Sequence, residues 1–244
     1  MQAFHNDPAI KAFYLARVAA HRDADEIRHG YYWEGGKGCA VGCTLHSSDH
    51  AAYELELGIP RILARLEDGI FESLASPEDQ VWPHAFLEAI PVGADLHIIW
   101  PRFFLRIATD TQYGLLQYVE APRFAKQKAS IQKVIEYYAQ WVSEGEKPAA
   151  YAAAAVAAAD AYTAAADAYT AAAYAAAAAV AADAYTAAAY AAAAAVAAAD
   201  TDAASDAFNQ KKRSVRLWQG EILLALLREA PGCLISAAAQ EVPA

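Results

Sequence analysis

The chain has 244 residues, which is long enough for one large domain or for a core with an appendage. Alanine inflates the hydrophobic fraction of 57%, and the large apolar side chains concentrate in residues 1–142 and 215–235. The formal net charge of −10 argues against a nucleic-acid-binding protein, because phosphate contacts need a basic face.

The N-terminal residues predict a long amphipathic helix. Asp7 followed by Pro8 is typical of an N-cap and a proline in the first helical position. Apolar residues then recur at helical spacing as far as Gly30, which is a natural C-terminal stop. The last turns carry side chains of metal-ligand type at intervals of four residues, and these would share one face: His21, Asp25 and His29.

An aromatic and glycine-rich loop follows this helix and leads into the stretch GKGCAVGCTLHSSDH. If residues 39–50 are helical, Cys39, Cys43, His46 and His50 form a single stripe. The ends of that stripe would lie about 16 Å apart, too far for one ion to bind all four. If the glycines prevent a helix before residue 43, both cysteines lie in a loop ahead of a helix that begins near Ser47.

Two short helices are expected next. Ser47, Ser48 or Asp49 can cap the first, which ends at Gly58. Pro60 opens the second, whose apolar residues fall on one face: Ile62, Leu63, Leu66, Ile70 and Phe71.

Three further helices complete the N-terminal region. Ser76-Pro77-Glu78-Asp79 is a strong helix start, and Pro91-Val92-Gly93 ends that helix. Asp95 can cap the next helix, which Pro101 is expected to kink or divide. The stretch LLQYV is expected to be a loop rather than a strand, and residues 123–143 form the last amphipathic helix.

Residues 149–207 contain no glycine or proline and are mostly alanine, which has the highest helix propensity. The block DAYTAAAYAAAAAVAA occurs at 167–182 and again at 183–198. Sixteen residues leave the two copies about 160° out of phase on a helix. The tract is therefore expected either to form a hairpin near residues 170–184, which we favour slightly, or to contact different neighbours along one long helix.

The alanine-rich tract is not expected to cross a membrane. Aspartates recur through it, and each would cost about 3 kcal/mol at the centre of a bilayer: Asp160, Asp167 and Asp183. Duplication of a tolerant helix explains the repeat best, and the alternative is a spacer or interaction rod through which the chain forms a homo-oligomer.

These elements predict an all-α protein in three parts. Residues 1–146 form a compact helical core region that carries the Cys/His cluster, and residues 147–208 form an alanine-rich helical arm. Residues 209–244 contain a C-terminal helix over 214–230, which packs back on the core, and a loose tail. Three cysteines without a disulfide-framework spacing, and an N-terminus without a signal peptide, indicate a cytoplasmic protein.

The Cys/His cluster is the candidate functional site, and four interpretations stay open. The side chains can be purely structural. They can bind a metal, with zinc as the candidate cofactor, through a set drawn from His21, Asp25, His29, Cys43, His46 and His50. Cys39 or Cys43 can act as a nucleophile with His46 or His21 as the base. A metal-free pocket can bind a small anionic ligand with the help of Tyr32, Trp33 and Lys37.

The first hundred residues also carry an extended motif. HRDADEI, YYWEGGKGCAVGCTLHSSDH, YELELGIP and ARLEDGIFE occur in this order, followed by FLEAIPVGADL and, near the end, LLALLREA. This pattern resembles a group of uncharacterised bacterial proteins that continue into an alanine-rich repetitive region. The repeats here use Asp-Ala-Tyr-Thr where the group uses Ser, Glu, Arg or Trp. The resemblance implies a natural bacterial family in a cytoplasmic setting, and it implies no activity, cofactor or catalytic residue.

The leading hypothesis is therefore a metal- or small-ligand-binding helical protein that binds neither nucleic acid nor membrane. One alternative is a thiol-dependent hydrolase or transferase that uses Cys39 or Cys43. The other is a structural protein that assembles through its alanine-rich arm.

Overall fold

The computed structural model describes residues 1–49, 51–119, 125–148 and 202–232, and these form an all-α fold, as the sequence predicts. The helices are α1 (Pro8–Asp23), α2 (Ala40–Leu45), α3 (Ala52–Leu57), α4 (Arg61–Phe71), α5 (Glu78–Ala89), α6 (Ile99–Thr109), α7 (Ala125–Glu144) and α11 (Asp202–Arg228). Two 3-10 helices, η1 (Ala3–Asn6) and η2 (Leu115–Val119), and a hairpin of β1 (Trp33–Glu34) and β2 (Lys37–Gly38) complete the described elements.

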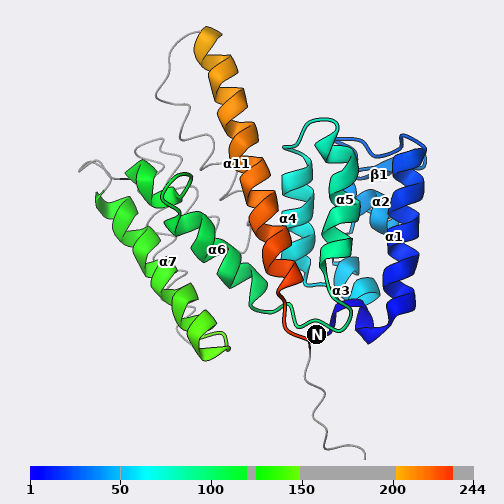
Figure 1. The fold of residues 1–244 in the computed structure, drawn as a ribbon, viewed down its shortest axis with the longest axis horizontal. Helices are drawn as coiled ribbons and strands as arrows, with labels where there is room; N and C mark the ends of the chain where they lie inside the picture. Colours follow the sequence, from blue (N-terminus) through cyan, green and yellow to red (C-terminus); the bar gives the residue numbers. More distant parts are fainter. Residues whose placement is uncertain (50, 120–124, 149–201, 233–244) are drawn as a thin grey trace, which may run out of the picture.

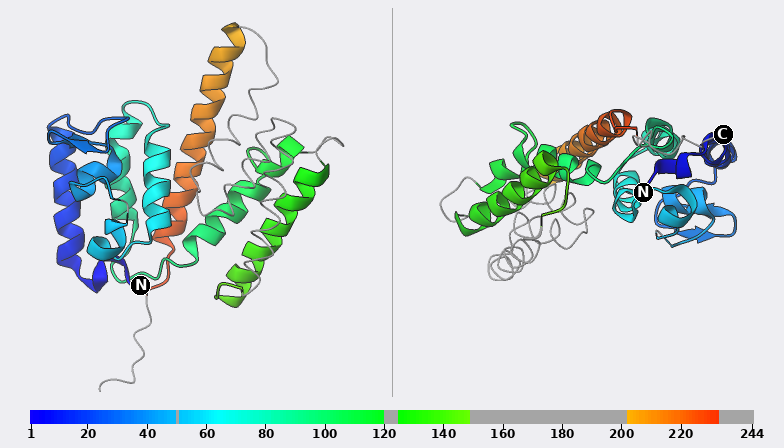
Figure 2. Two further views of the ribbon diagram at one scale, coloured as in Figure 1. Left: turned by 180° about the vertical axis from the view of Figure 1, so that it is seen from behind. Right: turned by 90° about the horizontal axis from the view of Figure 1, so that it is seen from below.

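Helix α11 lies between two groups of helices (Figures 1 and 2). On one side it packs against α4 and α5, and on the other against α6, which pairs with α7. Gly220 permits the close approach to α5, because a Cβ atom there would lie 3.0 Å from the Trp82 ring. Leu223 and Leu227 of α11 are fully buried in the shared core. The long C-terminal helix thus joins the two groups.

Helix α11 is longer than the expected helix over 214–230, because it begins at Asp202 inside the range assigned to the alanine-rich arm. The choice between a hairpin and one long helix for the rest of that arm concerns residues 149–201, which lie outside the described residues. Assembly through the arm stays a prediction.

Several predicted helix boundaries are confirmed. The Asp7 carboxylate accepts a hydrogen bond from the backbone N–H of Ala9, and Pro8 opens α1. Gly58 ends α3 in the left-handed conformation, with φ of 63°. The predicted break at Pro101 is wrong. Pro101 is the third residue of α6, and the N–H groups of a first helical turn have no partner in the helix, so its missing N–H costs little.

The end of α1 corrects a second expectation. The helix stops at Asp23, well before Gly30, and Asp25 has a positive φ of 56°. The Asp25 carboxylate accepts a hydrogen bond from Arg28, and this pair stabilises the turn. The predicted single stripe of His21, Asp25 and His29 is therefore wrong, because the last two residues are no longer on the helix.

The segment after this turn runs back across α2. Ile27 forms a parallel bridge with Gly38, and β1 pairs with β2 in an antiparallel hairpin. The carbonyl oxygen of Tyr32 comes so close to α2 that a Cβ atom would lie 2.4 Å from it at Gly38 and 1.5 Å at Gly42. The two glycines are therefore needed for this crossing.

The N-terminus is fixed by backbone hydrogen bonds at the far end of the molecule from the hairpin. The N–H of Ala3 donates to the carbonyl of Ala94, and the N–H of Asp95 donates to the carbonyl of Pro231. The first residues, the α5–α6 connection and the end of α11 therefore meet at one junction, close to the N label in Figure 1.

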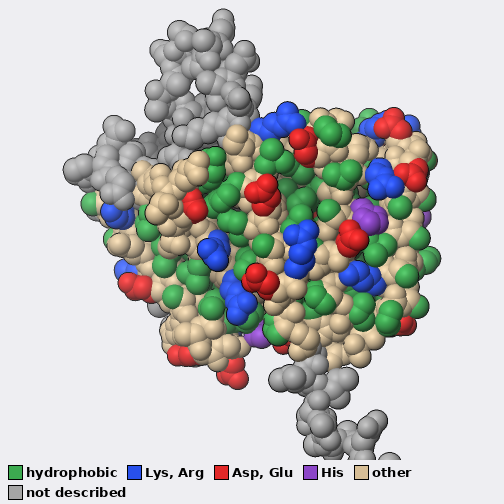
Figure 3. Space-filling model, viewed as in Figure 1, with side chains coloured by type: hydrophobic (Ala, Val, Ile, Leu, Met, Phe, Trp, Pro, Cys, Tyr) green, Lys and Arg blue, Asp and Glu red, His purple; other side chains and the backbone are tan. Residues whose placement is uncertain are grey.

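The described surface carries both signs of charge. On the face in Figure 3, basic and acidic side chains alternate among scattered apolar ones, so the described part of this face presents no continuous basic stripe. Within the residues that the structure describes, no helix has both the length and the apolarity to cross a membrane.

A buried acid lies between α3 and α4. The Tyr53 hydroxyl donates to the carboxyl group of Glu67, and both side chains are fully buried. Burial raises the pKa of Glu67 well above its usual range, so the folded protein keeps this proton at a pH where the unfolded chain has released it.

Loss of the Glu67 proton makes the free energy of unfolding depend on pH. The stabilisation by the protonated form is complete below the unfolded pKa of about 4.3 and is lost as pH rises toward the folded pKa. Relative to Glu67→Gln, the wild type should therefore lose unfolding free energy as pH rises above about 4.3, by at most about 1.4 kcal/mol per pH unit. Urea unfolding at several pH values measures this, with the exposed Glu229→Gln as control. Parallel pH profiles for wild type and Glu67→Gln would contradict the prediction.

The glycine crossing gives a second prediction. Gly42→Ala should lower the free energy of unfolding by about 1–3 kcal/mol or more, because the new methyl group overlaps the Tyr32 carbonyl. Gly232→Ala is the matched control, since nothing lies within 4 Å of a Cβ atom there, and it should change stability by less than about 0.5 kcal/mol. Equal unfolding midpoints for the two variants would show that the crossing tolerates a side chain.

Candidate functional site

The C-terminal ends of α1 and α2 bring two imidazoles together. His21 lies in the last turn of α1, and His46 is the C-cap of α2. Their Nε2 atoms are 2.8 Å apart. The Trp33 ring stacks on His46 with a centroid distance of 4.4 Å and an interplanar angle of 9°. It also makes an edge-to-face contact with the His21 ring, with a centroid distance of 5.5 Å. The site therefore draws its side chains from two helices and the hairpin.

Glu26 orients the first imidazole. Its Oε2 atom lies 2.7 Å from Nδ1 of His21. A carboxylate only accepts hydrogen bonds, so Nδ1 of His21 carries a proton. One proton is shared between the Nε2 atoms of His21 and His46. The result is a continuous hydrogen-bonded chain from Glu26 through His21 to His46.

The backbone at His46 directs its ring toward α1. His46 has φ of 56° and ψ of 36°, and its N–H donates to the carbonyl of Gly42 at 2.8 Å. The left-handed conformation costs a non-glycine residue about 1–2 kcal/mol. The stacking with Trp33 and the hydrogen bond to His21 offset this cost.

Burial and charge both keep His46 neutral. Burial lowers the pKa of His46, and the nearby Arg17 guanidinium lowers it further. Arg17 is held in place because its Nη1 donates to the carbonyl of Thr44 at 2.9 Å. Neutral imidazole is the form that coordinates metals and accepts protons, so His46 is available for either role near neutral pH.

The remaining residues of the predicted metal set lie elsewhere. Asp25 forms an exposed ion pair with Arg28. Nε2 of His29 is 2.9 Å from Asp79, and Nδ1 lies 3.9 Å from Glu72, so His29 faces α4 and α5. These positions follow from the early end of α1. His50 lies outside the described residues.

Cys39 and Cys43 are core side chains. Cys39 is the N-cap of α2, and its sulfur accepts a hydrogen bond from the backbone N–H of Gly42. The Cys43 thiol donates a hydrogen bond to the carbonyl of Gly38 at 3.3 Å. Both residues are at most 1% exposed. The Cys43 sulfur is thus engaged with backbone rather than with the imidazoles, and neither thiol lies in the loop expected ahead of a later helix.

Burial raises the pKa of Cys43 to about 12, and burial followed by the nearby Asp68 raises the pKa of Cys39. A thiol nucleophile needs the opposite shift, because only the thiolate attacks. The geometry therefore favours a structural role for both sulfurs.

The three predicted ligand-binding residues separate in the structure. Trp33 joins the imidazole pair, as described above. Tyr32 is 61% exposed, and its backbone carbonyl packs over α2. Lys37 is exposed and pairs in register with Glu34 across the hairpin.

The sequence pattern does not indicate that Glu26 and Arg17 belong to this site. Glu26 follows His21 by five residues, a spacing that places two side chains on different faces of a helix. Only the turn at Asp25 brings the carboxylate back to the imidazole. The periodicity of a helix therefore cannot predict the contact between Glu26 and His21.

No three His, Cys, Asp or Glu side chains among the described residues gather into a set that could hold a metal ion. His21 and His46 therefore supply two nitrogen donors, and any further ligand to a metal here comes from solvent or a bound molecule. Comparisons of the chain with protein-family models, curated proteins and solved structures found no match. Function is accordingly inferred from the geometry of this site.

The buried thiols give a third prediction. In a Cys233→Ser background, Cys39 and Cys43 should react with a disulfide reagent at pH 8 at least about a hundredfold more slowly in the folded protein than in urea, because burial keeps them protonated. Absorbance of the released thiol follows the reaction. Rapid labelling of either residue in the folded protein would restore the nucleophile hypothesis.

Proposed function

We propose that the protein binds a divalent transition-metal ion, zinc in the first instance, through the Nε2 atoms of His21 and His46. The observation that carries this proposal is the pair of ring nitrogens facing each other at 2.8 Å, with Glu26 hydrogen-bonded behind His21. Histidine imidazoles are the commonest nitrogen donors to zinc in proteins.

The spacing of the pair suits a shared metal. Two zinc–nitrogen bonds of about 2.0–2.1 Å at a tetrahedral angle place the nitrogens about 3.3 Å apart. The ring centroids lie 5.0 Å apart, so the two rings meet nearly end to end. Admitting an ion therefore requires the nitrogens to separate by about half an ångström and the rings to turn until both lone pairs point at the ion. The proton that His46 shares with His21 moves to Nδ1 of His46 or to solvent, because a coordinating nitrogen must be unprotonated.

Glu26 and Trp33 support this role. A histidine ligand commonly donates its second ring N–H to a carboxylate, which fixes the tautomer and makes the free nitrogen more basic. The 2.7 Å contact between Nδ1 of His21 and Glu26 has this form. Trp33 covers one face of the His46 ring and limits its rotation.

Two protein donors leave coordination positions open on the metal. A small anionic ligand, which the sequence also suggests, can bind there as a further ligand. The proposed function is therefore metal-dependent binding of a small anion, rather than a closed structural zinc site with four protein ligands.

Metal titration of untagged protein gives a fourth prediction. Cu²⁺, which binds nitrogen donors more tightly than Zn²⁺, should quench the fluorescence of Trp33 because the indole stacks on a ligand. Zn²⁺ binding is then measured by competition with a colorimetric zinc indicator. His21→Ala and His46→Ala should abolish saturable binding, and Glu26→Gln should weaken it by about 10–100-fold.

His84→Ala is the matched control. His84 is a partly exposed histidine on α5 that lies 3.8 Å from Glu88, away from the imidazole pair, and its loss should leave the affinity unchanged. Trp33→Phe should remove the Cu²⁺ quenching while keeping Zn²⁺ binding. Stoichiometric binding that survives in His46→Ala, or no binding by the wild type, would overturn the proposal.

A further inference from the structure

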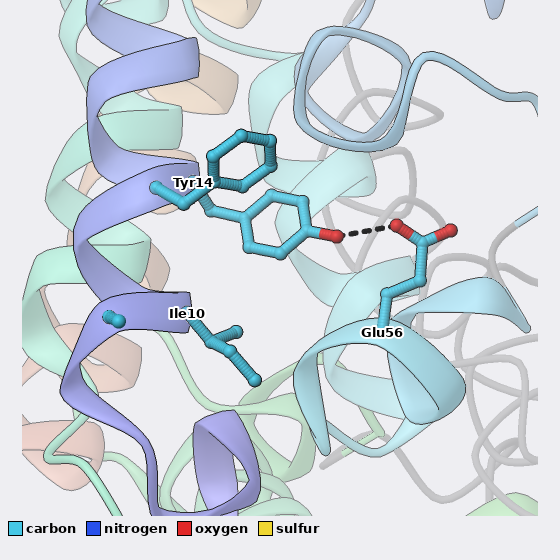
Figure 4. A pocket seen from close by; sticks show the side chains of 5 residues that line it. Ile10, Tyr14 and Glu56 are labelled. Carbon is cyan, nitrogen blue, oxygen red and sulfur yellow. Dashed lines mark hydrogen bonds between the residues drawn. The ribbon is translucent and has the colours of Figure 1, made fainter.

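A recess lies on the same face of α1 as His21, nearer the start of the helix. It has a volume of about 440 Å³ and lies between α1 and α3 (Figure 4). Its lining residues are Ala9, Ile10, Phe13, Tyr14 and Glu56. This volume falls within the range of about 300–1,000 Å³ of small-molecule sites.

The walls of this recess are apolar and accessible. Phe13 is 54% exposed, although large apolar side chains are usually covered in a folded protein. Its ring is held by an edge-to-face contact with Tyr14 at 5.1 Å and by the Arg17 guanidinium at 4.5 Å. Phe13 and Ile10 therefore offer a fixed apolar surface to a ligand.

The Glu56 carboxylate supplies the negative charge at the rim. The Tyr14 hydroxyl donates to Oε2 of Glu56 at 2.5 Å, and Figure 4 shows this bond across the recess from Ile10. Among the described residues, no basic side chain forms an ion pair with Glu56. The Arg17 guanidinium keeps its positive charge over the Phe13 and Tyr14 rings, but its Nη1 donates to the Thr44 carbonyl rather than to Glu56. Glu56 therefore presents its second carboxyl oxygen beside the apolar wall.

We propose that this recess binds a small organic cation: a ligand with an ammonium group hydrogen-bonded to Glu56 and an apolar ring or branched chain against Phe13 and Ile10. Charge complementarity selects this class, because a carboxylate repels anions and gains little from a neutral ligand. The volume accommodates a single ring with a short side chain.

The two proposed sites share no binding residue, although the charge of Glu56 acts on His46 through space. Tyr14 and His21 are seven residues apart on α1, which places them on one face but about 10 Å apart along its axis. Cation binding is therefore measured in the presence of EDTA, and His46→Ala should keep it. Cation binding in EDTA can therefore be observed even if the protein binds no metal, and metal binding can be observed even if the recess binds no cation.

Isothermal titration calorimetry with benzylamine, benzyl alcohol and phenylacetate at pH 7.5 tests the proposal. Benzylamine should bind saturably with one site, at least about fivefold more tightly than benzyl alcohol, and phenylacetate should not bind. Added salt should weaken benzylamine binding, because the carboxylate is exposed.

Variants locate the site. Glu56→Gln and Phe13→Ala should each weaken benzylamine binding at least about fivefold. Glu88→Gln removes an exposed acid from α5, and Leu55→Ala removes an 81% exposed neighbour of Glu56, so both should bind as the wild type does.

Equal affinities for the amine and the alcohol, tighter binding of phenylacetate, or no binding of benzylamine would each overturn the proposal, and these ligand comparisons need no variant to fold. Unchanged affinity in Glu56→Gln would also overturn it.

Discussion

The close crossing of the Tyr32 carbonyl over Gly38 and Gly42 is the constraint on which the imidazole site depends. Residues 24–38 leave the end of α1 and must return across α2 to reach its first turn. Only a helix surface without side chains lets a backbone approach this closely. The crossing places Trp33 directly over His46, and the N–H of Cys39 bonds to the carbonyl of Tyr31. The hairpin thus fixes both the start of α2 and the ring at its end.

The site that results lies at two helix C-termini. The last carbonyl groups of a helix carry partial negative charge, which favours a cation nearby. His21 belongs to the final turn of α1, and His46 caps α2. Glu26 adds a full negative charge behind His21. The end of α1 and Glu26 thus place negative charge behind His21, whereas the Arg17 guanidinium places positive charge near His46. The two ring nitrogens meet between groups of opposite charge.

The sequence predicts the helix boundaries that depend on one residue and its immediate neighbours in the chain. The cap at Asp7, the stop at Gly58 and the helix start after Pro60 each depend on one residue and its immediate neighbours, and the structure has them at those positions. Pro101 shows how such a rule fails. A proline breaks a helix interior but not a first turn, and α6 begins at Ile99, after Asp95, without a side-chain cap.

The candidate site was predictable only in part. His21, His46 and Trp33 belong to the predicted sets, because a short glycine-rich connector folds the two histidine-bearing segments together. Glu26 could not be found, since its contact depends on a left-handed Asp25 that ends α1 early. Of the interpretations that the sequence leaves open for the thiols, the structure favours the structural one. Cysteines next to glycines look accessible in a sequence, whereas the same glycines allow the hairpin to bury them.

The packing of α11 also bears on how the chain can change over evolution. Its contacts are made with α4, α5 and α6, all of which precede the duplicated blocks, and its own apolar residues follow them. The described contacts that position α11 therefore involve none of the duplicated blocks. Gain or loss of a whole DAYTAAAYAAAAAVAA unit would therefore leave the helical body and the imidazole pair intact. Related chains could then differ widely in length while sharing one unchanged core.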